Sequence, residues 1–154
     1  MITLFFRYGR KALIGSIALA DGSLLAFGTF HLESYEVEKK ERKVQLELLS
    51  QLTVGNGFSR IILCGDTNFA FTDEDQHLGM NIFGDCWKDL YPDQQGNTYG
   101  FRRLDRLYYS KKSIAPVSMR IIGTEPLPST NVNPSDHFGI AAVVKVKEEP
   151  DSGA

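Results

Sequence analysis

The sequence predicts an α/β fold in which one long helix lies on one face of a mixed, mostly antiparallel sheet. Three observations predict it: strand-like apolar runs recur along the chain, one long segment has helical periodicity, and turn-forming residues separate these elements. With 154 residues, 42% of them hydrophobic, the chain can bury the core of one domain. We expect this domain to span residues 1–147. Residues 148–154, which are acidic and contain Pro, Ser and Gly, are expected to form a flexible tail.

Seven runs rich in β-branched and aromatic residues are expected to form strands, because Gly, Pro, Asp or Asn bounds each run. They are residues 2–6, 12–19, 24–31, 60–64, 104–109, 117–122 and 138–146. Asp21-Gly22 lies between the second and third runs and is typical of a tight hairpin. Within these strands we expect a largely buried set: Ile61, Leu63, Cys64, Leu107, Val117, Ile121, Ile140 and Val143.

The helix is expected between Ser34, which can cap its start, and Gly55-Asn56-Gly57, which can end it. One apolar stripe is expected to face the core, namely Val37, Val44, Leu48 and Leu52. The helix lies between the third and fourth strands, so it predicts a crossover between two parallel strands. One helix leaves the other face of the sheet uncovered, and a further layer or a second copy is expected to cover it.

Composition excludes several classes of protein. The 17 Lys and Arg residues are balanced by 19 Asp and Glu, so no global basic field draws the chain onto nucleic acid. The two cysteines, Cys64 and Cys86, match no zinc or redox spacing, which favours a reduced intracellular protein. No apolar stretch approaches the roughly 18 residues of a membrane span, and no signal-peptide pattern occurs. Any contact with nucleic acid must therefore come from local basic patches. The alternative is that these patches are ordinary solvated faces and turns. The candidate patches are Arg7, Arg10 and Lys11; Lys39, Lys40, Arg42 and Lys43; and Arg102, Arg103, Arg106, Lys111 and Lys112.

The sharpest candidate for chemistry follows the fourth strand, where the apolar run ends at Gly65 and presents Asp66 and Asn68. Side chains two residues apart at a strand end point the same way and can hold one water or phosphate between them. Asp66 could act as a general base, and Asn68 could donate a hydrogen bond to a developing anion. The alternative is an Asx-type turn that closes the strand.

A second candidate precedes the last strand, at Asp136 and His137. His137 could donate a hydrogen bond to a phosphate oxygen, and an acid must then orient its ring. Asp105 is the best candidate for that acid, although it could instead form a surface salt bridge with a neighbouring Arg. A third strand ends at His31, followed by Glu33 and Ser34; His31 alone could equally be a structural residue.

These motifs, in this order, resemble the C-terminal motif series of the endonuclease/exonuclease/phosphatase superfamily. Within it they are specifically similar to the tyrosyl-DNA phosphodiesterase 2 family. The matching segments are His31-Leu32-Glu33-Ser34, Gly65-Asp66-Thr67-Asn68, Asp85-Cys86-Trp87, Leu104-Asp105-Arg106 and Ser135-Asp136-His137. The resemblance implies that residues 1–147 are the C-terminal half of a four-layer α/β sandwich of the DNase I type.

The resemblance also implies a function: a Mg²⁺-dependent phosphodiesterase, with Mn²⁺ possible, that removes tyrosine from DNA 5′ phosphates during DNA repair in the nucleus. Asp66 would activate water, Asn68 would align it or the phosphate, and His137 would stabilise the transition state. Asp105 would orient His137, while His31 would bind the phosphate from the opposite side. A groove for single-stranded DNA would be lined by Glu33, Ser34, Trp87, Leu104 and Arg106, and Asp136 would be a weak metal ligand.

The principal Mg²⁺ ligand of that family is a Glu of the N-terminal half, and the residues before Gly9 do not contain it. Glu33 belongs to a different motif. Phe69-Ala70 stand where the family often has a basic residue, and Phe138 stands where a Trp is common. We therefore expect a truncated chain that is inactive alone. Two alternatives stay open: a non-catalytic module that binds nucleic acid or protein, and a nuclease or phosphatase with another substrate.

Overall fold

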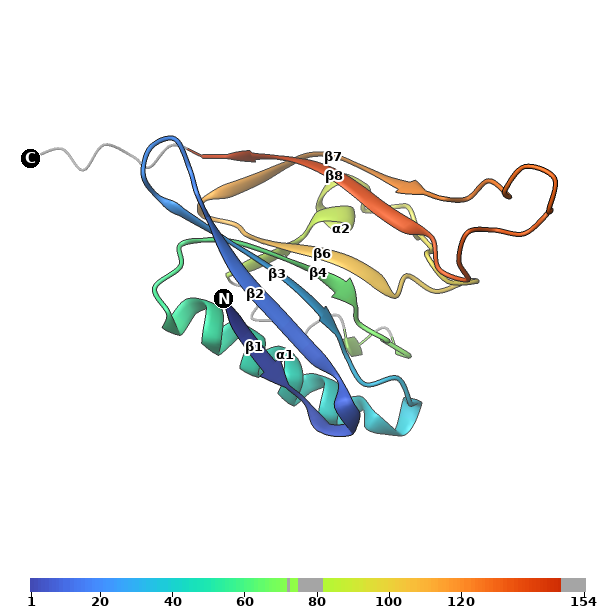
Figure 1. Cartoon of the computed structure of the whole chain (residues 1–154), viewed down its shortest axis with the longest axis horizontal. Helices are drawn as coiled ribbons and strands as arrows, with labels where there is room; N and C mark the ends of the chain where they lie inside the picture. The colour runs from blue at the N-terminus through green and yellow to red at the C-terminus, as the bar shows by residue number, and fades with distance from the viewer. Residues whose placement is uncertain (72, 75–81, 148–154) are drawn as a thin grey trace, which may run out of the picture.

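The computed structural model describes residues 1–71, 73–74 and 82–147, and the predicted tail and the side chain of Arg7 lie outside this part. A six-stranded sheet forms the centre, with the long helix α1 (Lys39–Gly55) on one side. The short helix α2 (Cys86–Leu90) and the hairpin of β7 (Ile114–Ile122) and β8 (Gly139–Val146) lie on the other side (Figure 1). The predicted α/β class, with a mostly antiparallel sheet and one long helix, is confirmed.

The central sheet has the strand order β1-β2-β3-β4-β6-β5, and β3–β4 is its parallel pair. Every predicted strand forms, and the structure adds β5 and α2, which are too short to carry a periodic signal. Single 3₁₀ turns occur at Arg7–Gly9 and Glu36–Glu38. The strands of this sheet are β1 (Ile2–Phe5), β2 (Lys11–Ala18), β3 (Leu24–His31), β4 (Arg60–Asp66), β5 (Phe83–Asp85) and β6 (Asp105–Ser110).

Both predicted connections in the first half of the chain are confirmed. At the β2–β3 hairpin, Asp21 accepts a hydrogen bond from the main-chain nitrogen of Ser23 at 2.9 Å, and Gly22 has a φ of 80°, which favours glycine. The β3–α1–β4 segment is the predicted crossover, because β3 and β4 are parallel neighbours. This connection puts the carboxyl ends of two adjacent strands at the same edge of the sheet.

The predicted core face of α1 is wrong by about a third of a turn. Val37 lies outside the helix and is 86% exposed, and Val44 and Leu48 are exposed. The side chains that α1 buries are mostly polar, namely Arg42, Gln45, Leu46, Leu49 and Thr53. A hydrophobic pattern therefore could not identify the buried face of the helix. The predicted end at Gly55 is confirmed, and Gly57 follows with a φ of 78°. The predicted cap at Ser34 is wrong, because α1 begins after the 3₁₀ turn and Glu38 precedes it.

A fully buried ion pair explains why α1 turns its polar face inward. Arg42 donates to both carboxylate oxygens of Glu74, at 2.6 and 2.9 Å, and both side chains are inaccessible to solvent. Arg42 also donates to the main-chain oxygens of Glu33 and Tyr35, while Glu74 accepts from the main-chain nitrogens of Ala70 and Phe71. The pair therefore fastens the loops that follow β3 and β4 to the same helix.

The face of the sheet opposite α1 is half covered. Over β4 and β6 it packs against α2 and the β7–β8 hairpin, with Ile62, Tyr109 and Ile114 buried there. Over β2 and β3 it leaves Leu13, Ile17 and Phe27 exposed at 42 to 56%. Of the predicted core, Ile61 and Leu63 are buried and four members are partly buried, namely Cys64, Leu107, Ile121 and Ile140.

Val117 and Val143 were expected in the core, but each is 57% exposed. They lie on the hairpin of β7 and β8, which pairs with no third strand among the described residues, and one face of that hairpin is open. No helix within the described ranges is long and apolar enough to cross a membrane.

Replacing Arg42 with Met should destabilise the chain by about 3–5 kcal/mol, because it leaves the buried carboxylate of Glu74 without its cation. Chemical denaturation followed by circular dichroism measures this loss. Lys43→Met is the matched control: Lys43 forms an exposed pair with Glu47 one turn away, and its loss should cost about 0.5 kcal/mol or less. Equal costs for the two variants would contradict a structural role for the buried pair.

Candidate active site

The strand register gathers three polar side chains at one edge of the sheet. His31, the last residue of β3, pairs with Asp66 at the end of β4, and Asp66 pairs in turn with Asp105 at the start of β6. Paired residues of neighbouring strands point to the same face. Gly65 allows the close approach of β3, since a Cβ there would lie 1.9 Å from the carbonyl oxygen of Phe30.

Asp66 uses its two oxygens differently. Oδ1 accepts a hydrogen bond from the main-chain nitrogen of Asn68 at 2.8 Å, which is the Asx-type turn that the sequence left open. Oδ2 lies 3.3 Å from Nε2 of His31. The turn therefore fixes the carboxylate through Oδ1 and leaves Oδ2 directed toward His31. An Asx-type turn and a role for Asp66 as a general base are thus compatible.

Asp105 and His137 form a second acid–histidine pair. Nδ1 of His137 lies 2.8 Å from Oδ2 of Asp105, so this nitrogen carries the proton that Asp105 accepts, and Nε2 is left to act toward a ligand. The ring of Tyr99 packs against His137 with the two centroids 4.7 Å apart. Thr98 holds the start of β6, because its Oγ1 accepts from the main-chain nitrogens of Leu104 and Asp105.

The two pairs are close enough to perturb one another's titration. Burial raises the pKa of Asp66 above its ordinary value, and the nearby charge of Asp105 raises it further. Burial lowers the pKa of His31 in spite of Asp66, and the guanidinium of Arg10 lowers it as well. Burial alone would lower the pKa of His137, but the hydrogen bond and charge of Asp105 raise it above its ordinary value. The surroundings therefore shift the pKa values of the two histidines in opposite directions, that of His31 down and that of His137 up.

Asn68 has a φ of 50°, a left-handed conformation that Asn tolerates better than most residues. Its Nδ2 donates to the main-chain oxygen of Leu32 at 3.0 Å, so one of its two amide hydrogens is already used. Thr67, between Asp66 and Asn68, is buried and donates through Oγ1 to the main-chain oxygen of Leu104 at 2.7 Å. The loop after β4 is thus fixed to both neighbouring strands.

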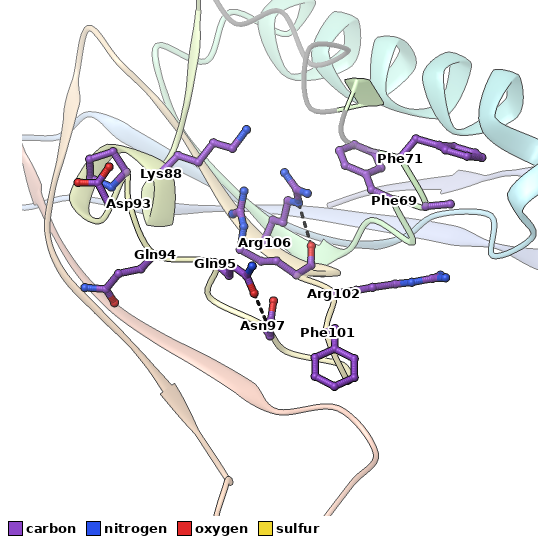
Figure 2. A pocket seen from close by; sticks show the side chains of 13 residues that line it. Phe69, Phe71, Lys88, Asp93, Gln94, Gln95, Asn97, Phe101, Arg102 and Arg106 are labelled. Carbon is purple, nitrogen blue, oxygen red and sulfur yellow. Dashed lines mark hydrogen bonds between the residues drawn. The ribbon is translucent and has the colours of Figure 1, made fainter.

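A pocket of about 460 Å³ lies near this edge, lined by the segments that follow β4 and α2 and by the loop before β6. Figure 2 shows Phe69 and Phe71 coming from the segment after β4, and Phe101 and Arg102 from the loop before β6. Arg106 also lines the pocket, and its Cζ atom lies 4.6 Å from the ring centroid of Phe69. Its cationic lining residues are Lys88, Arg102, Arg103 and Arg106.

The sequence matches no protein-family model, and no curated protein matches it. The structure, however, is similar to solved structures of D. rerio TDP2. A humanized form with 14 mutations gives a TM-score of 0.78 at 25% identity, covering 94% of this chain and 66% of that chain. A complex with a single-stranded DNA product gives 0.76 at 22% identity, covering 94% and 67%.

Two further structures extend the comparison. The human nocturnin catalytic domain gives a TM-score of 0.74 at 20% identity, covering 96% of this chain and 59% of that chain. An endonuclease/exonuclease/phosphatase family protein of Bacteroides thetaiotaomicron gives 0.67 at 19% identity, covering 91% and 56%. The chain therefore has the fold of these endonuclease/exonuclease/phosphatase-type structures. The predicted resemblance is confirmed, and the chain spans 56–67% of the length of these relatives.

Four of the five residues expected to line a DNA groove are buried, namely Glu33, Trp87, Leu104 and Arg106. Trp87 packs against Tyr91 and donates to the main-chain oxygen of Gln94, and Leu104 supplies the carbonyl that Thr67 contacts. Glu33 is 1% exposed. Motif resemblance identified these positions but not their orientation, which depends on tertiary packing. Ser34 is exposed, and Arg106 lines the pocket although it is only 6% exposed.

The described residues do not fit the metal centre that the superfamily resemblance implies. Asp136 is exposed and accepts a weak hydrogen bond from Ser135 at 3.3 Å. No group of three or more His, Cys, Asp or Glu side chains within the described ranges could hold a metal ion. Oxygen-rich coordination of Mg²⁺ needs carboxylates that converge, and the carboxylates at this edge are committed to His31 and His137.

Sequence reasoning also missed three residues of the site. Arg10 appeared there only in a basic patch, yet its guanidinium lies against His31. Tyr99 packs on His137, and Asp85 is a buried carboxylate that pairs with two of the arginines lining the pocket, Arg103 and Arg106. Asp85 lies in the Asp85-Cys86-Trp87 match, from which only Trp87 was expected at the site.

Replacing Asp105 with Asn should lower the pKa of His137, because it removes the negative charge that stabilises the imidazolium and leaves only a neutral amide acceptor. The stability that this pair contributes is full below the ordinary histidine pKa of 6.5 and is lost as pH rises through the raised folded-state pKa. Histidine NMR titration measures the change. Asp93→Asn, on the pocket side, is the control. An unchanged His137 pKa in the Asp105 variant would contradict the assigned pair.

Proposed function

We propose that this chain is part of a phosphodiesterase that hydrolyses a phosphodiester at the 5′ end of DNA. One observation carries the proposal: the His31–Asp66 and Asp105–His137 pairs come from distant parts of the chain and meet at one sheet edge. A base, a hydrogen-bond donor and a cationic imidazole in one place are what attack of water on a phosphodiester requires. The complete domain's activity is therefore inferred from residues that this part contributes.

The chemistry assigned to each residue follows from its contacts. Asp66 takes a proton from the attacking water, whose oxygen forms a bond to phosphorus as the bond to the leaving oxygen breaks. His137 donates through Nε2 to a non-bridging oxygen, where negative charge accumulates, and Asp105 stabilises the imidazolium. His31 contacts the phosphate from the other side of Asp66, and Asn68 aligns the water with its remaining amide hydrogen.

The pocket supports single-stranded DNA as the substrate. Arg102, whose side chain is 54% exposed, can contact a backbone phosphate, whereas Arg103 and Arg106 are paired with the buried Asp85. The ring of Phe101, which is 96% exposed, can stack on an unpaired base. The loop before β6 connects the pocket with the Asp105–His137 pair, since Tyr99 contacts His137 and Arg102 lines the pocket. One D. rerio TDP2 structure that resembles this chain is a complex with a single-stranded DNA product.

We extend the proposal to a 5′-phosphotyrosyl end as the substrate, and hence to DNA repair in the nucleus. The motif resemblance to the tyrosyl-DNA phosphodiesterase 2 family supports this assignment. A phenolate is also a good leaving group, because its conjugate acid has a pKa of about 10. The proposal includes Mg²⁺, or Mn²⁺, as the metal of the complete site, and residues outside the described part would supply its ligands. When bound, the metal would neutralise phosphate charge.

A non-catalytic module that binds nucleic acid or protein is the second candidate. The observation that favours it is the lack of a metal-binding group among the described residues. It would use the basic and aromatic pocket without needing Asp66. The two candidates therefore differ in what an Asp66 substitution does.

The test joins this chain to the part of D. rerio TDP2 that it does not cover. The 154-residue chain alone should show no Mg²⁺-dependent cleavage of a 5′-phosphotyrosyl oligonucleotide, and the chimera should cleave it. Asp66→Asn in the chimera should reduce turnover by at least about 10²-fold, because it removes the base. Lys112→Met, an exposed change, should leave turnover unaltered.

One outcome would decide against the proposed activity, and a second would decide against the need for a complementary part. A chimera that binds the oligonucleotide and never cleaves it would favour the non-catalytic module. Cleavage by the chain alone would show that the described residues suffice without the missing ligands. A chimera that cleaves other phosphate esters but not the phosphotyrosyl end would keep the hydrolase and change its substrate.

A further inference from the structure

The Asp105–His137 pair joins two parts of the chain that lie 32 residues apart. Asp105 begins β6, where it pairs with Asp66 of β4. His137 follows a largely exposed loop, residues 123–136, that leads from β7 to β8. A contact between two partly exposed side chains does little by itself to hold such a loop in place. The main chain around both residues must therefore be fixed by other contacts.

Thr98 supplies such contacts on both sides of the pair. Its main-chain oxygen accepts a hydrogen bond from the nitrogen of Phe138, the residue after His137, at 2.7 Å. Its Oγ1 accepts from the main-chain nitrogens of Leu104 at 3.1 Å and Asp105 at 3.0 Å. These last two bonds use both acceptor positions of the hydroxyl. Because Thr98 is 1% exposed, water competes poorly for the bonds that it makes.

A closed turn holds Thr98 itself in place. The main-chain nitrogens of Thr98 and Tyr99 both donate to the oxygen of Arg102, at 2.9 and 3.0 Å. The nitrogen of Arg102 donates back to the oxygen of Tyr99 at 2.9 Å, and Gly100 within the turn has a φ of 52°, which favours glycine. The ring of Tyr99 packs against the imidazole of His137. The turn therefore fixes the main chain beside the pair through Thr98 and the ring through Tyr99.

Leu104 connects Thr98 with the other acid of the site. Its nitrogen donates to Thr98, while its oxygen accepts from the nitrogen and Oγ1 of Thr67, at 2.8 and 2.7 Å. Thr67 directly follows Asp66 and is buried like Thr98. The β-branched side chain of Thr has a restricted χ1, which keeps each hydroxyl directed at the main chain. Asp66 and Asp105 thus share one framework, and Thr98 connects the loop of His137 to it.

We propose that Thr98 is a positioning residue that holds Asp105 and His137 in contact and thereby directs Nε2 of His137 toward the phosphate. The part that His137 plays toward phosphate rests on the proposed function, whereas the contact between the two residues does not. Thr98 is too deeply buried to touch the substrate, so it acts through the pair. Its effect can be large, because a misplacement of about 1 Å in a catalytic group can cost about 10²-fold in rate.

The experiment is imidazole NMR of the 154-residue chain with isotope-labelled histidines, at a pH high enough for His137 to be neutral. The nitrogen chemical shifts show which ring nitrogen carries the proton. In the wild-type chain this should be Nδ1, because Asp105 accepts from that nitrogen. Thr98→Val keeps the shape of the side chain but lacks the acceptor for Asp105 and Leu104. The pair should then separate, and the proton should move largely to Nε2, which an unconstrained histidine prefers. Thr98→Ser, which retains the hydroxyl, should keep the Nδ1 form.

Thr53→Val is the matched control. Thr53 is also fully buried, and its Oγ1 donates to the main-chain oxygen of Leu49 at 2.9 Å within α1. Each substitution removes one buried, hydrogen-bonded hydroxyl, but Thr53→Val should leave the Nδ1 form of His137 intact. Hydrogen exchange gives a second readout. The main-chain N–H of Asp105 should exchange about tenfold faster in Thr98→Val than in Thr53→Val, since it loses its hydrogen bond to Oγ1.

Three results would overturn the proposal: a wild-type chain whose neutral His137 carries its proton on Nε2, a folded Thr98→Val chain that keeps the Nδ1 form, or a Thr53→Val chain that loses it to the same degree. If Thr98→Val does not fold, Thr98→Ala, which also lacks Oγ1, takes its place. Failure here is distinguishable from failure of the proposed function. A chimera that never cleaves would end the proposed function and leave the NMR result on Thr98 unchanged.

Discussion

The parallel pairing of β3 with β4 is the constraint on which the site depends. It ends both strands at one edge and sets His31 beside Asp66, while β6, antiparallel to β4, starts there with Asp105. Parallel pairing needs a crossover, and α1 supplies it. The buried Arg42–Glu74 pair then fixes the loops after both strands to that helix. A shift of one residue in this register would turn the catalytic candidates to the opposite face.

Most of the fold could be predicted from the sequence because strands carry strong local signals. Apolar runs bounded by turn residues identified every long strand, and the strand–helix–strand order gave the parallel pair. The orientation of α1 could not be predicted, since its buried face holds Arg42 and Gln45, whose partners lie elsewhere in the chain. The predicted burial of Val117 and Val143 was wrong for a related reason. The pattern of apolar residues identifies a strand, but it does not show which face of the strand other elements cover.

The candidate site was predicted best where residues follow strand ends, and worst where packing decides exposure. The contacts of Asp66 with His31 and of Asp105 with His137 agree with the arrangement expected from the motifs, while their catalytic roles stay predictions. Trp87, Leu104 and Glu33 were expected on the surface of a groove and are buried. Arg10 was overlooked because a single Arg beside a strand has no distinguishing pattern, and its contacts come from segments more than twenty residues away.

The claim that these strand ends form one phosphate site is tested most directly by a crystal structure of the chain with a 5′-phosphorylated single-stranded oligonucleotide. The account predicts the terminal phosphate at the sheet edge, between His31 on one side and Nε2 of His137 on the other, with the following nucleotides directed toward Phe101. A terminal phosphate bound instead on the basic face of α1, at Lys40 and Lys43, with the edge empty, would contradict it.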